Sequence, residues 1–272
     1  MKKISKLFWF LNKPEYFFVL FEILKNKFFL KEKDKVHSLQ ICKKKNISHN
    51  LFKKNFFLNK KNYNLSKHID YNHCYKIVKK NRGMLDGAQN FGQKKTNISI
   101  KNFISKSGAS NIELLFEIIR NERPKNIIET GVAYGWSSYA ILLAIRENKF
   151  GKLLSIDLPY PLLNEKKNIG ILVPKKMKKN WKILFCRDKI GIVKAIKKFN
   201  YKIDLFHYDS DKNYNAKLNN LKNIWKYIQP NGIVICDDIN DNLAFFDFIR
   251  IIKKKYYVVK TGNKFLGIVR NA

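Results

Sequence analysis

Acidic residues follow two predicted strands in the second half of the 272-residue chain. Asp209 and Asp211 come after the apolar run IDLFHY, and the pair Asp237-Asp238 follows the run GIVIC. Because the carboxyl ends of adjacent parallel strands meet at one edge of an open α/β sheet, we expect these four carboxylates to converge. Carboxylates that lie close together repel unless a cation or protons separate them. An oxygen-rich set suits Mg²⁺, Mn²⁺ or Ca²⁺. The alternative is that each acid only caps a helix or lies in a loop.

A second candidate site is a glycine turn in the segment NIIETGVAYGWSS, residues 126–138. Two β-branched residues lead toward Gly131, Gly135 follows four residues later, and Ser137 and Ser138 form a hydroxyl-rich helix start. This order predicts a strand, a tight turn and a helix N-terminus. Glycine lets the chain reverse and lets a ligand approach the backbone, and the first N–H groups of a helix attract negative charge. Taken alone, the segment fits an ordinary βα turn equally well.

Asp157 ends a further predicted strand, LLSID, 26 residues after Gly131. In Rossmann-like sheets an acid at this strand end accepts hydrogen bonds from ribose hydroxyls. An NAD site is the weaker interpretation, because Gly131 is followed by Val132 and Ala133 and the fingerprint G-x-G-x-x-G is incomplete.

The elements that would position these residues alternate regularly from Ser110 onward, which predicts a parallel sheet with helices on both faces. The predicted strands span residues 126–130, 153–157, 182–186, 204–208 and 232–237, and the predicted helices span 137–148, 189–199, 213–227 and 242–254. Thr261, Gly262 and Asn263 form a tight turn between two β-rich runs, which predicts a terminal hairpin. The predicted fold class is α/β, with a Rossmann-like doubly wound sheet.

The spacing of Glu129, Gly131 and Gly135 resembles the first motif, acid-x-Gly-x-x-x-Gly, of the class I S-adenosylmethionine-dependent methyltransferases. This resemblance implies a seven-stranded sheet in the order 3-2-1-4-5-7-6 with a terminal antiparallel hairpin, and S-adenosyl-L-methionine as the cofactor. The cofactor-binding residues that it implies are Glu129, Gly131, Ala133, Gly135, Ser137, Asp157 and Asp188. Glu129 and the turn would hold the amino acid part, and Asp157 would hold the ribose. Asp188 would bind the adenine amino group or, equally well, cap a helix.

The stretch DLFHYDSDKNY, with the later QPNG and IVICDDI, is similar to a branch of these enzymes, the metal-dependent sugar O-methyltransferases of the macrocin O-methyltransferase type. The similarity covers residues 110–248. It implies that Asp209, Asp237 and Asp238 bind Mg²⁺ or another divalent cation. The reaction implied is methylation of a sugar or glycan hydroxyl whose pKa the metal lowers.

Two residues are candidates for the general base in that reaction. Asp211 matches the second acid of a D-x-D pattern, and Lys212 has the offset of the base in the related catechol-type enzymes. The sequence departs from the pattern at two places. Ser210 replaces the usual glycine between the acids, and Lys212-Asn213 replaces a frequent histidine.

The formal net charge of +34 raises the alternative of a methyltransferase acting on RNA or another polyanion. The lysines are scattered and accompanied by many Asn, Ile, Phe and Tyr, which is typical of an AT-rich genome. No N/D-P-P-Y/F motif of nucleic-acid base methyltransferases follows the fourth strand. We therefore expect a small-molecule or glycan acceptor, with nucleic acid as the weaker interpretation. A non-methylating protein on the same fold is the third alternative.

Residues 1–107 are predicted to form a basic, aromatic-rich and mainly helical extension, and residues 108–272 the methyltransferase domain. A predicted helix at 16–29 lacks the uncharged run that a membrane span needs. It would pack on the domain or in a homodimer, or lie peripherally on an anionic membrane. The glycine-punctuated loop 83–92 is predicted to be a lid or a linker. Four cysteines without C-x-x-C spacing predict free thiols and a cytoplasmic protein, with any membrane contact at the inner face.

Overall fold

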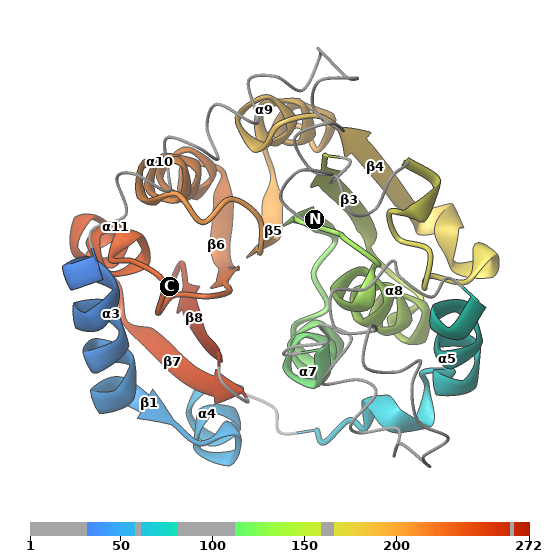
Figure 1. Cartoon of the computed structure of the whole chain (residues 1–272), viewed down its shortest axis with the longest axis horizontal. Coiled ribbons are helices and arrows are strands. Elements are labelled where there is room, and N and C mark those ends of the chain that lie inside the picture. Colours follow the sequence, from blue (N-terminus) through green and yellow to red (C-terminus); the bar gives the residue numbers. More distant parts are fainter. Residues whose placement is uncertain (1–31, 58–60, 81–111, 159–165, 262–263) are drawn as a thin grey trace, which may run out of the picture.

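The computed structural model describes residues 32–57, 61–80, 112–158, 166–261 and 264–272. They contain a sheet with the strand order β1-β7-β8-β6-β5-β2-β3-β4 (Figure 1). The strands are β1 (Asn46–Ile47), β2 (Asn126–Thr130), β3 (Lys152–Asp157), β4 (Trp181–Phe185), β5 (Ile203–Tyr208), β6 (Ile228–Cys236), β7 (Tyr256–Thr261) and β8 (Lys264–Arg270). The helices are α3 (Glu32–Lys45), α4 (His49–Phe56), α5 (Tyr71–Lys80), α7 (Ile112–Glu122), α8 (Trp136–Asn148), α9 (Asp188–Lys198), α10 (Tyr214–Trp225) and α11 (Ala244–Ile252). Short 3₁₀ helices are η2 (Leu65–Lys67), η4 (Lys166–Asn168) and η5 (Lys175–Asn180).

The strand order confirms the predicted topology. Strands β2 to β6 pair in parallel, and β8 lies antiparallel between β6 and β7. Counted from β2 as the first strand, the order is 3-2-1-4-5-7-6. The sheet has eight strands rather than the predicted seven, because β1 pairs in parallel with β7 through Asn46 opposite Val258. The correction has a simple physical reason, since β7 would otherwise expose an unpaired edge.

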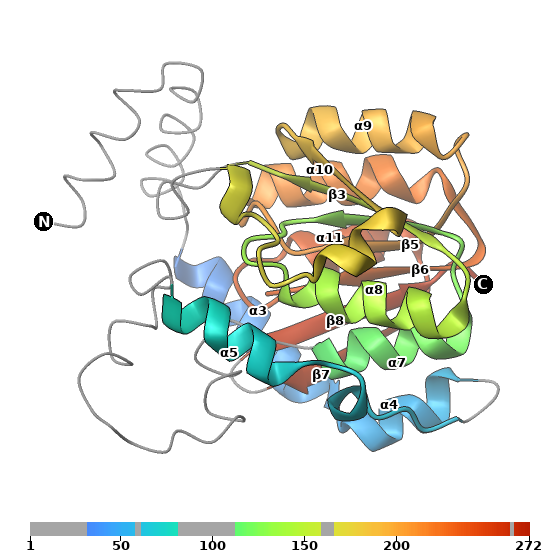
Figure 2. The ribbon, with the colours of Figure 1, turned by 90° about the vertical axis from the view of Figure 1, so that its right-hand side faces the viewer.

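Helices cover both faces of the sheet, as the regular alternation of elements predicted (Figure 2). Successive strand residues point to opposite faces, so Ile127 and Ile128 belong to two different cores. One core includes side chains from α4, α5, α7 and α8, and the other includes side chains from α3, α9, α10 and α11. The fold is thus a Rossmann-like doubly wound α/β sheet with a terminal antiparallel hairpin.

The described part of the N-terminal extension is mainly helical, packs on the sheet and adds the short strand β1 to it. Cys42 from α3 and Phe52 from α4 are fully buried in the two cores. The predicted boundary at residue 107, the helix at 16–29 and the loop at 83–92 lie outside the described residues. None of the helices that the structure describes is long and apolar enough to cross a membrane.

The parallel strands bring the predicted site residues to one edge of the sheet. Glu129 lies in β2, Asp157 ends β3, and Asp188 begins α9 just after β4. Asp209 follows β5 and Asp237 follows β6. The carboxyl ends of five neighbouring strands therefore surround one region, as expected for a ligand site in an open α/β sheet.

Candidate active site

The turn after β2 requires glycine at both predicted positions. Gly131 has a φ of +82° and Gly135 a φ of +94°, a region that residues with a Cβ rarely adopt. A Cβ on Gly131 would lie 1.9 Å from the carbonyl oxygen of Asp209, and one on Gly135 would lie 2.8 Å from the Cα of Gly170. The glycines thus let the turn pack directly against the end of β5 and against the loop that carries Gly170.

Asp157 holds this turn in place. Its Oδ2 accepts hydrogen bonds from the amides of Val132 (2.8 Å) and Ala133 (2.7 Å), and its Oδ1 accepts one from the amide of Leu158 (2.7 Å). Burial raises the pKa of Asp157 to about 6, although the three hydrogen bonds favour the ionised form. A carboxylate has room for about four hydrogen bonds, and the described residues supply these three.

Asp188 is connected to two other strand ends through Ser210. The Ser210 hydroxyl lies 2.5 Å from Asp188 Oδ2 and 2.9 Å from Thr130 Oγ1. Because a hydroxyl has one proton, Ser210 donates to the carboxylate and accepts from Thr130. Burial and the charges of Asp211 and Asp157 raise the pKa of Asp188 to about 6. The serine that departs from the family pattern therefore links β2, β5 and α9.

These pKa shifts predict how stability depends on pH. We expect Asp157 and Asp188 to lower the free energy of unfolding as the pH rises from about 4 to about 6. Their folded pKa values of about 6 exceed the ordinary aspartate pKa of 3.8, so in this interval the folded state binds more protons than the unfolded state. Urea unfolding across this interval should show a weaker decline for Asp188→Asn than for the unmutated protein. Asp34→Asn, on α3, is the control. The prediction would be contradicted if the free energy of unfolding of Asp188→Asn fell with pH as steeply as that of the unmutated protein.

Glu129 is the centre of a buried hydrogen-bond network. Its side chain is fully buried and accepts hydrogen bonds from the hydroxyls of Ser137 (2.7 Å), Ser138 (2.6 Å) and Ser155 (2.7 Å). His207 Nδ1 lies 3.6 Å from Glu129 Oε1. The network joins β2 to the first turn of α8 and to β3, and thereby fixes the glycine turn between them. The predicted contact of Glu129 and Ser137 with a cofactor stays a prediction.

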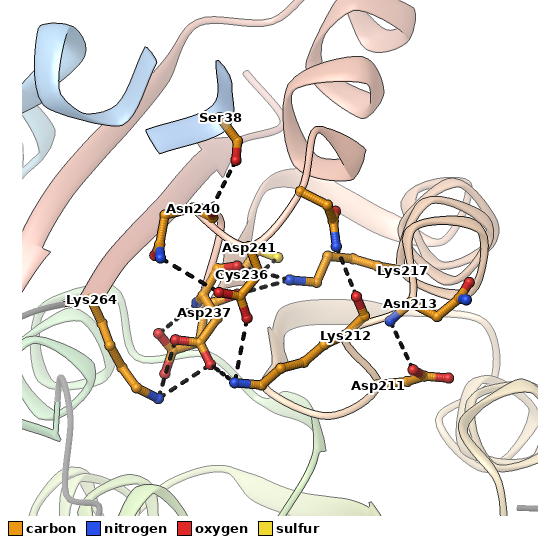
Figure 3. Close-up of polar contacts among 12 residues, drawn as sticks. Ser38, Asp211, Lys212, Asn213, Lys217, Cys236, Asp237, Asn240, Asp241 and Lys264 are labelled. Atoms are coloured by element: carbon orange, nitrogen blue, oxygen red, sulfur yellow. Dashed lines mark hydrogen bonds and ion pairs between the residues drawn. The ribbon is translucent and has the colours of Figure 1, made fainter. Parts of the chain in front are cut away.

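Figure 3 shows a cluster of acids and lysines from the loops after β5 and β6 and from the start of β8. Asp238 is 4% exposed, and its Oδ2 lies 2.5 Å from Lys212 Nζ. Lys264 Nζ lies 3.2 Å from Asp238 Oδ1, and Lys212 Nζ lies 3.4 Å from Asp241 Oδ2. Figure 3 shows Lys212 and Lys264 reaching toward the same place from two sides. Two ammonium groups thus share the Asp238 carboxylate.

Other elements fix the loop that carries Asp238. The buried Lys217, from α10, donates hydrogen bonds to the backbone carbonyls of Asp237 (3.2 Å) and Asp238 (3.1 Å). Asn242 Nδ2 donates to the carbonyl of Lys212 (2.8 Å), and Ser38 on α3 donates to the carbonyl of Asn240 (2.8 Å). The loop after β6, residues 237–243, which we call the acid loop, is therefore held by α10 and by the N-terminal region.

The charges of the cluster shift several pKa values. Burial and the charge of Asp237 raise the pKa of Asp209. Burial alone would lower the pKa of Lys212, but the hydrogen bond and charge of Asp238 raise it overall. At Lys264, too, burial would lower the pKa, but the charges of Asp237, Asp209 and Asp238 raise it overall. Both lysines are consequently protonated at neutral pH.

The predicted metal ligands do not fit a divalent cation in this arrangement. The described residues contain no group of three or more His, Cys, Asp or Glu side chains arranged to hold a metal ion. Asp209, Asp237 and Asp238 do come to one edge of the sheet, but both oxygens of Asp238 lie beside ammonium groups. A dication bound to Asp238 would stand close to two like charges, and their repulsion would weaken its binding.

The two predicted bases lie in different surroundings. The Lys212 side chain extends toward Asp238 and Asp241. Asp211 is exposed, and its carboxylate lies beside Asn213, away from the ammonium groups of Lys212 and Lys264 (Figure 3). The Asp211 carboxylate accepts a hydrogen bond from the amide of Asn213 (2.9 Å), and Asn213 caps α10 through the amide of Ala216. In this structure Asp211 helps to begin a helix.

Sequence reasoning missed three residues of this site, Lys217, Asn242 and Lys264. Only Lys264 carried a usable signal, because it directly follows the predicted Thr261-Gly262-Asn263 turn. A residue at that hairpin tip lies at the same sheet edge as the end of β6, since β8 runs antiparallel to β6.

Comparisons with known proteins agree with the architecture. Residues 128–239, less than half of the chain, match a family model described as a methyltransferase domain. This segment contains the glycine turn and the acids after β3, β5 and β6, which supports the predicted resemblance to methyltransferases. No curated protein matches the chain.

Several solved structures are similar to this chain at low sequence identity. An O-methyltransferase from Bacillus cereus in complex with SAH has 12% identity and a TM-score of 0.49, over 81% of this chain and 96% of that one. TomG, an O-methyltransferase from Streptomyces achromogenes in complex with SAM, has 14% identity and a TM-score of 0.46, over 82% and 95%. SAH-bound PaMTH1 from Podospora anserina has 13% identity and a TM-score of 0.43, over 78% and 98%. Likenesses at this level carry no information about the substrate.

Proposed function

We propose that this protein is an S-adenosylmethionine-dependent methyltransferase that methylates a hydroxyl oxygen. The observation that carries the proposal is the contact between the glycine turn and Asp157. The Asp157 carboxylate accepts hydrogen bonds from the turn amides of Val132 and Ala133. The match of residues 128–239 to a methyltransferase domain supports the same conclusion.

The chain's own residues would hold the cofactor along the edge of the sheet. The carboxylate of Asp157 suits a ribose hydroxyl, because the described residues occupy three of its about four acceptor positions. Asp188 suits the adenine amino group. The turn from Gly131 to Gly135 would lie against the amino acid part. Glu129 would act indirectly, because three hydroxyls already occupy its carboxylate. When bound, the cofactor supplies an electrophilic methyl group on a sulfonium, and alignment with the acceptor oxygen provides much of the rate.

Removal of the acceptor proton is assigned here to Asp209, with Asp211 and Lys212 as the alternatives that the sequence suggested. Asp209 follows β5 and lies beside the glycine turn. Its amide donates a hydrogen bond to the carbonyl of Thr130 (2.9 Å), and its own carbonyl packs on Gly131. Lys212 is less suited, because its ion pair with Asp238 keeps it protonated. Asp211 is less suited because it lies apart from the cluster.

The acceptor is proposed to be a sugar or glycan hydroxyl, on the basis of the resemblance in residues 110–248. The metal assistance implied by that resemblance would require both Lys212 and Lys264 to leave Asp238. An RNA or polyanion acceptor is the alternative that the charge of +34 suggests. A steep loss of RNA binding with salt would favour that alternative.

Calorimetric binding of S-adenosylmethionine and S-adenosylhomocysteine tests the proposed function. We expect micromolar binding by the unmutated protein, loss of binding in Asp157→Ala and retained binding in Asp237→Ala. The Asp157 carboxylate accepts hydrogen bonds from two amides of the glycine turn, whereas Asp237 follows β6. No binding by the unmutated protein would mean that the glycines serve packing alone, and the methyltransferase proposal would fall.

The assignment of the base predicts a contrast between neighbouring acids. Asp209→Asn should lower kcat by about 10²–10⁴-fold, the usual contribution of a general base, with little change in S-adenosylhomocysteine affinity. Asp211→Asn should lose much less activity, since that side chain serves the start of α10. The measurement is S-adenosylhomocysteine release in a screen of sugar and diol acceptors. A larger loss in Asp211→Asn than in Asp209→Asn would transfer the role of base to Asp211.

A further inference from the structure

Lys264 lies at the tip of the terminal hairpin. It is the first residue of β8 and faces Thr261 across the terminal hairpin. The amide of Ile239 donates a hydrogen bond to the carbonyl of Phe265 (3.2 Å), which joins the hairpin tip to the acid loop. The hairpin thereby places the Lys264 ammonium 3.2 Å from Asp238, whose side chain is 6% exposed.

The Lys264 ammonium lies against one of the three predicted metal ligands. Its Nζ is 3.2 Å from each carboxylate oxygen of Asp238. Lys212 supplies a second ammonium to the same carboxylate, and Figure 3 shows the two lysines approaching from two sides. An ammonium beside converging carboxylates relieves their mutual repulsion, as a bound cation would.

We propose that Lys264, together with Lys212, supplies the positive charge that a divalent cation supplies in metal-dependent sites, so that this site works without a metal ion. This inference rests on the proposed methyltransferase function. Each ammonium has three donors, and the side chains of Lys212 and Lys264 are 57% and 39% exposed. Both therefore retain donors for an acceptor oxygen that gains negative charge as its proton leaves.

Binding of Mn²⁺ to the full chain, followed by electron paramagnetic resonance, tests the inference. The unmutated protein should bind no Mn²⁺ stoichiometrically. Lys264→Met should gain one bound Mn²⁺ per chain, with an affinity at least about tenfold higher, because a like charge near the carboxylates is removed. Asp238→Asn added to Lys264→Met should abolish the gain.

Two controls separate charge from general disturbance. Lys260→Met removes an exposed lysine from the same hairpin and should leave Mn²⁺ binding as in the unmutated protein. Lys264→Arg keeps the charge and should likewise gain no Mn²⁺. Stoichiometric micromolar Mn²⁺ binding by the unmutated protein that is lost in Asp238→Asn would overturn the inference, and this result does not depend on whether Lys264→Met folds.

S-adenosylhomocysteine calorimetry on the same samples separates this inference from the proposed function. The unmutated protein should bind S-adenosylhomocysteine equally well with EDTA and with Mg²⁺, and a requirement for Mg²⁺ would overturn the metal-free site. Absence of S-adenosylhomocysteine binding under both conditions would contradict the proposed function, while the Mn²⁺ comparison would still decide what Lys264 does to the carboxylates.

Discussion

Gly131→Ala is expected to destabilise the protein by about 2–5 kcal/mol and to abolish binding of S-adenosylhomocysteine. The φ of +82° disfavours any residue with a Cβ, and the added Cβ would lie 1.9 Å from the carbonyl oxygen of Asp209. That contact is with backbone at the end of β5, which has little freedom to move, because the Asp209 amide is bonded to the carbonyl of Thr130. Relief of the clash would therefore displace the turn from Asp157 or separate β2 from β5.

A substitution in the same turn provides the matched control for Gly131→Ala. Ala133 also has a positive φ, +46°, so Ala133→Gly should relieve strain and change the stability by no more than about 1 kcal/mol. Urea unfolding gives the stabilities, and calorimetry gives the affinities for S-adenosylhomocysteine. Unchanged stability and affinity in Gly131→Ala would show that the turn can move, and that the site does not depend on its close packing against Asp209.

Glu129→Ala is expected to have the second large effect, a loss of about 3–5 kcal/mol in the free energy of unfolding, the usual cost of removing one partner from a buried charged network. The substitution removes the acceptor of three serine hydroxyls and leaves His207 without its nearest carboxylate. Ser155 also accepts a hydrogen bond from Trp181 Nε1 (2.8 Å), so the disturbance would spread to β4.

Glu129→Gln separates charge from shape in this network. The amide keeps one acceptor oxygen and the volume of the side chain. The free energy of unfolding of Glu129→Gln should therefore lie between that of the unmutated protein and that of Glu129→Ala. Glu147→Ala is the surface control, because the Arg146–Glu147 pair is partly exposed and such pairs contribute about 1 kcal/mol or less. Thermal and urea unfolding measure all three, and a Glu129→Ala protein as stable as Glu147→Ala would contradict the structural role given to Glu129.

Much of the fold was predictable because its signals are local. The alternation of strand and helix patterns after Ser110 predicted the five parallel strands, and the Thr261-Gly262-Asn263 turn predicted the hairpin. The strand order agreed with the resemblance. The eighth strand was not predicted, because β1 consists of only two residues, Asn46 and Ile47. A strand so short is defined by its pairing with Val258 and Val259 rather than by its own sequence.

The sequence by itself determined which groups stand at the edge of the sheet. A glycine turn and acids that end predicted strands have fixed places once the strands are parallel, so Gly131, Asp157, Asp209 and Asp237 could be assigned to one edge in advance. Only the tertiary structure decided what faces these acids. Lys264 is far from Asp238 in the sequence, and it reaches that carboxylate because β8 pairs antiparallel with β6 and places the hairpin tip beside the acid loop. A local pattern specifies where a charge stands along its strand, but the choice between a metal ion and a lysine as its partner depends on contacts between distant segments.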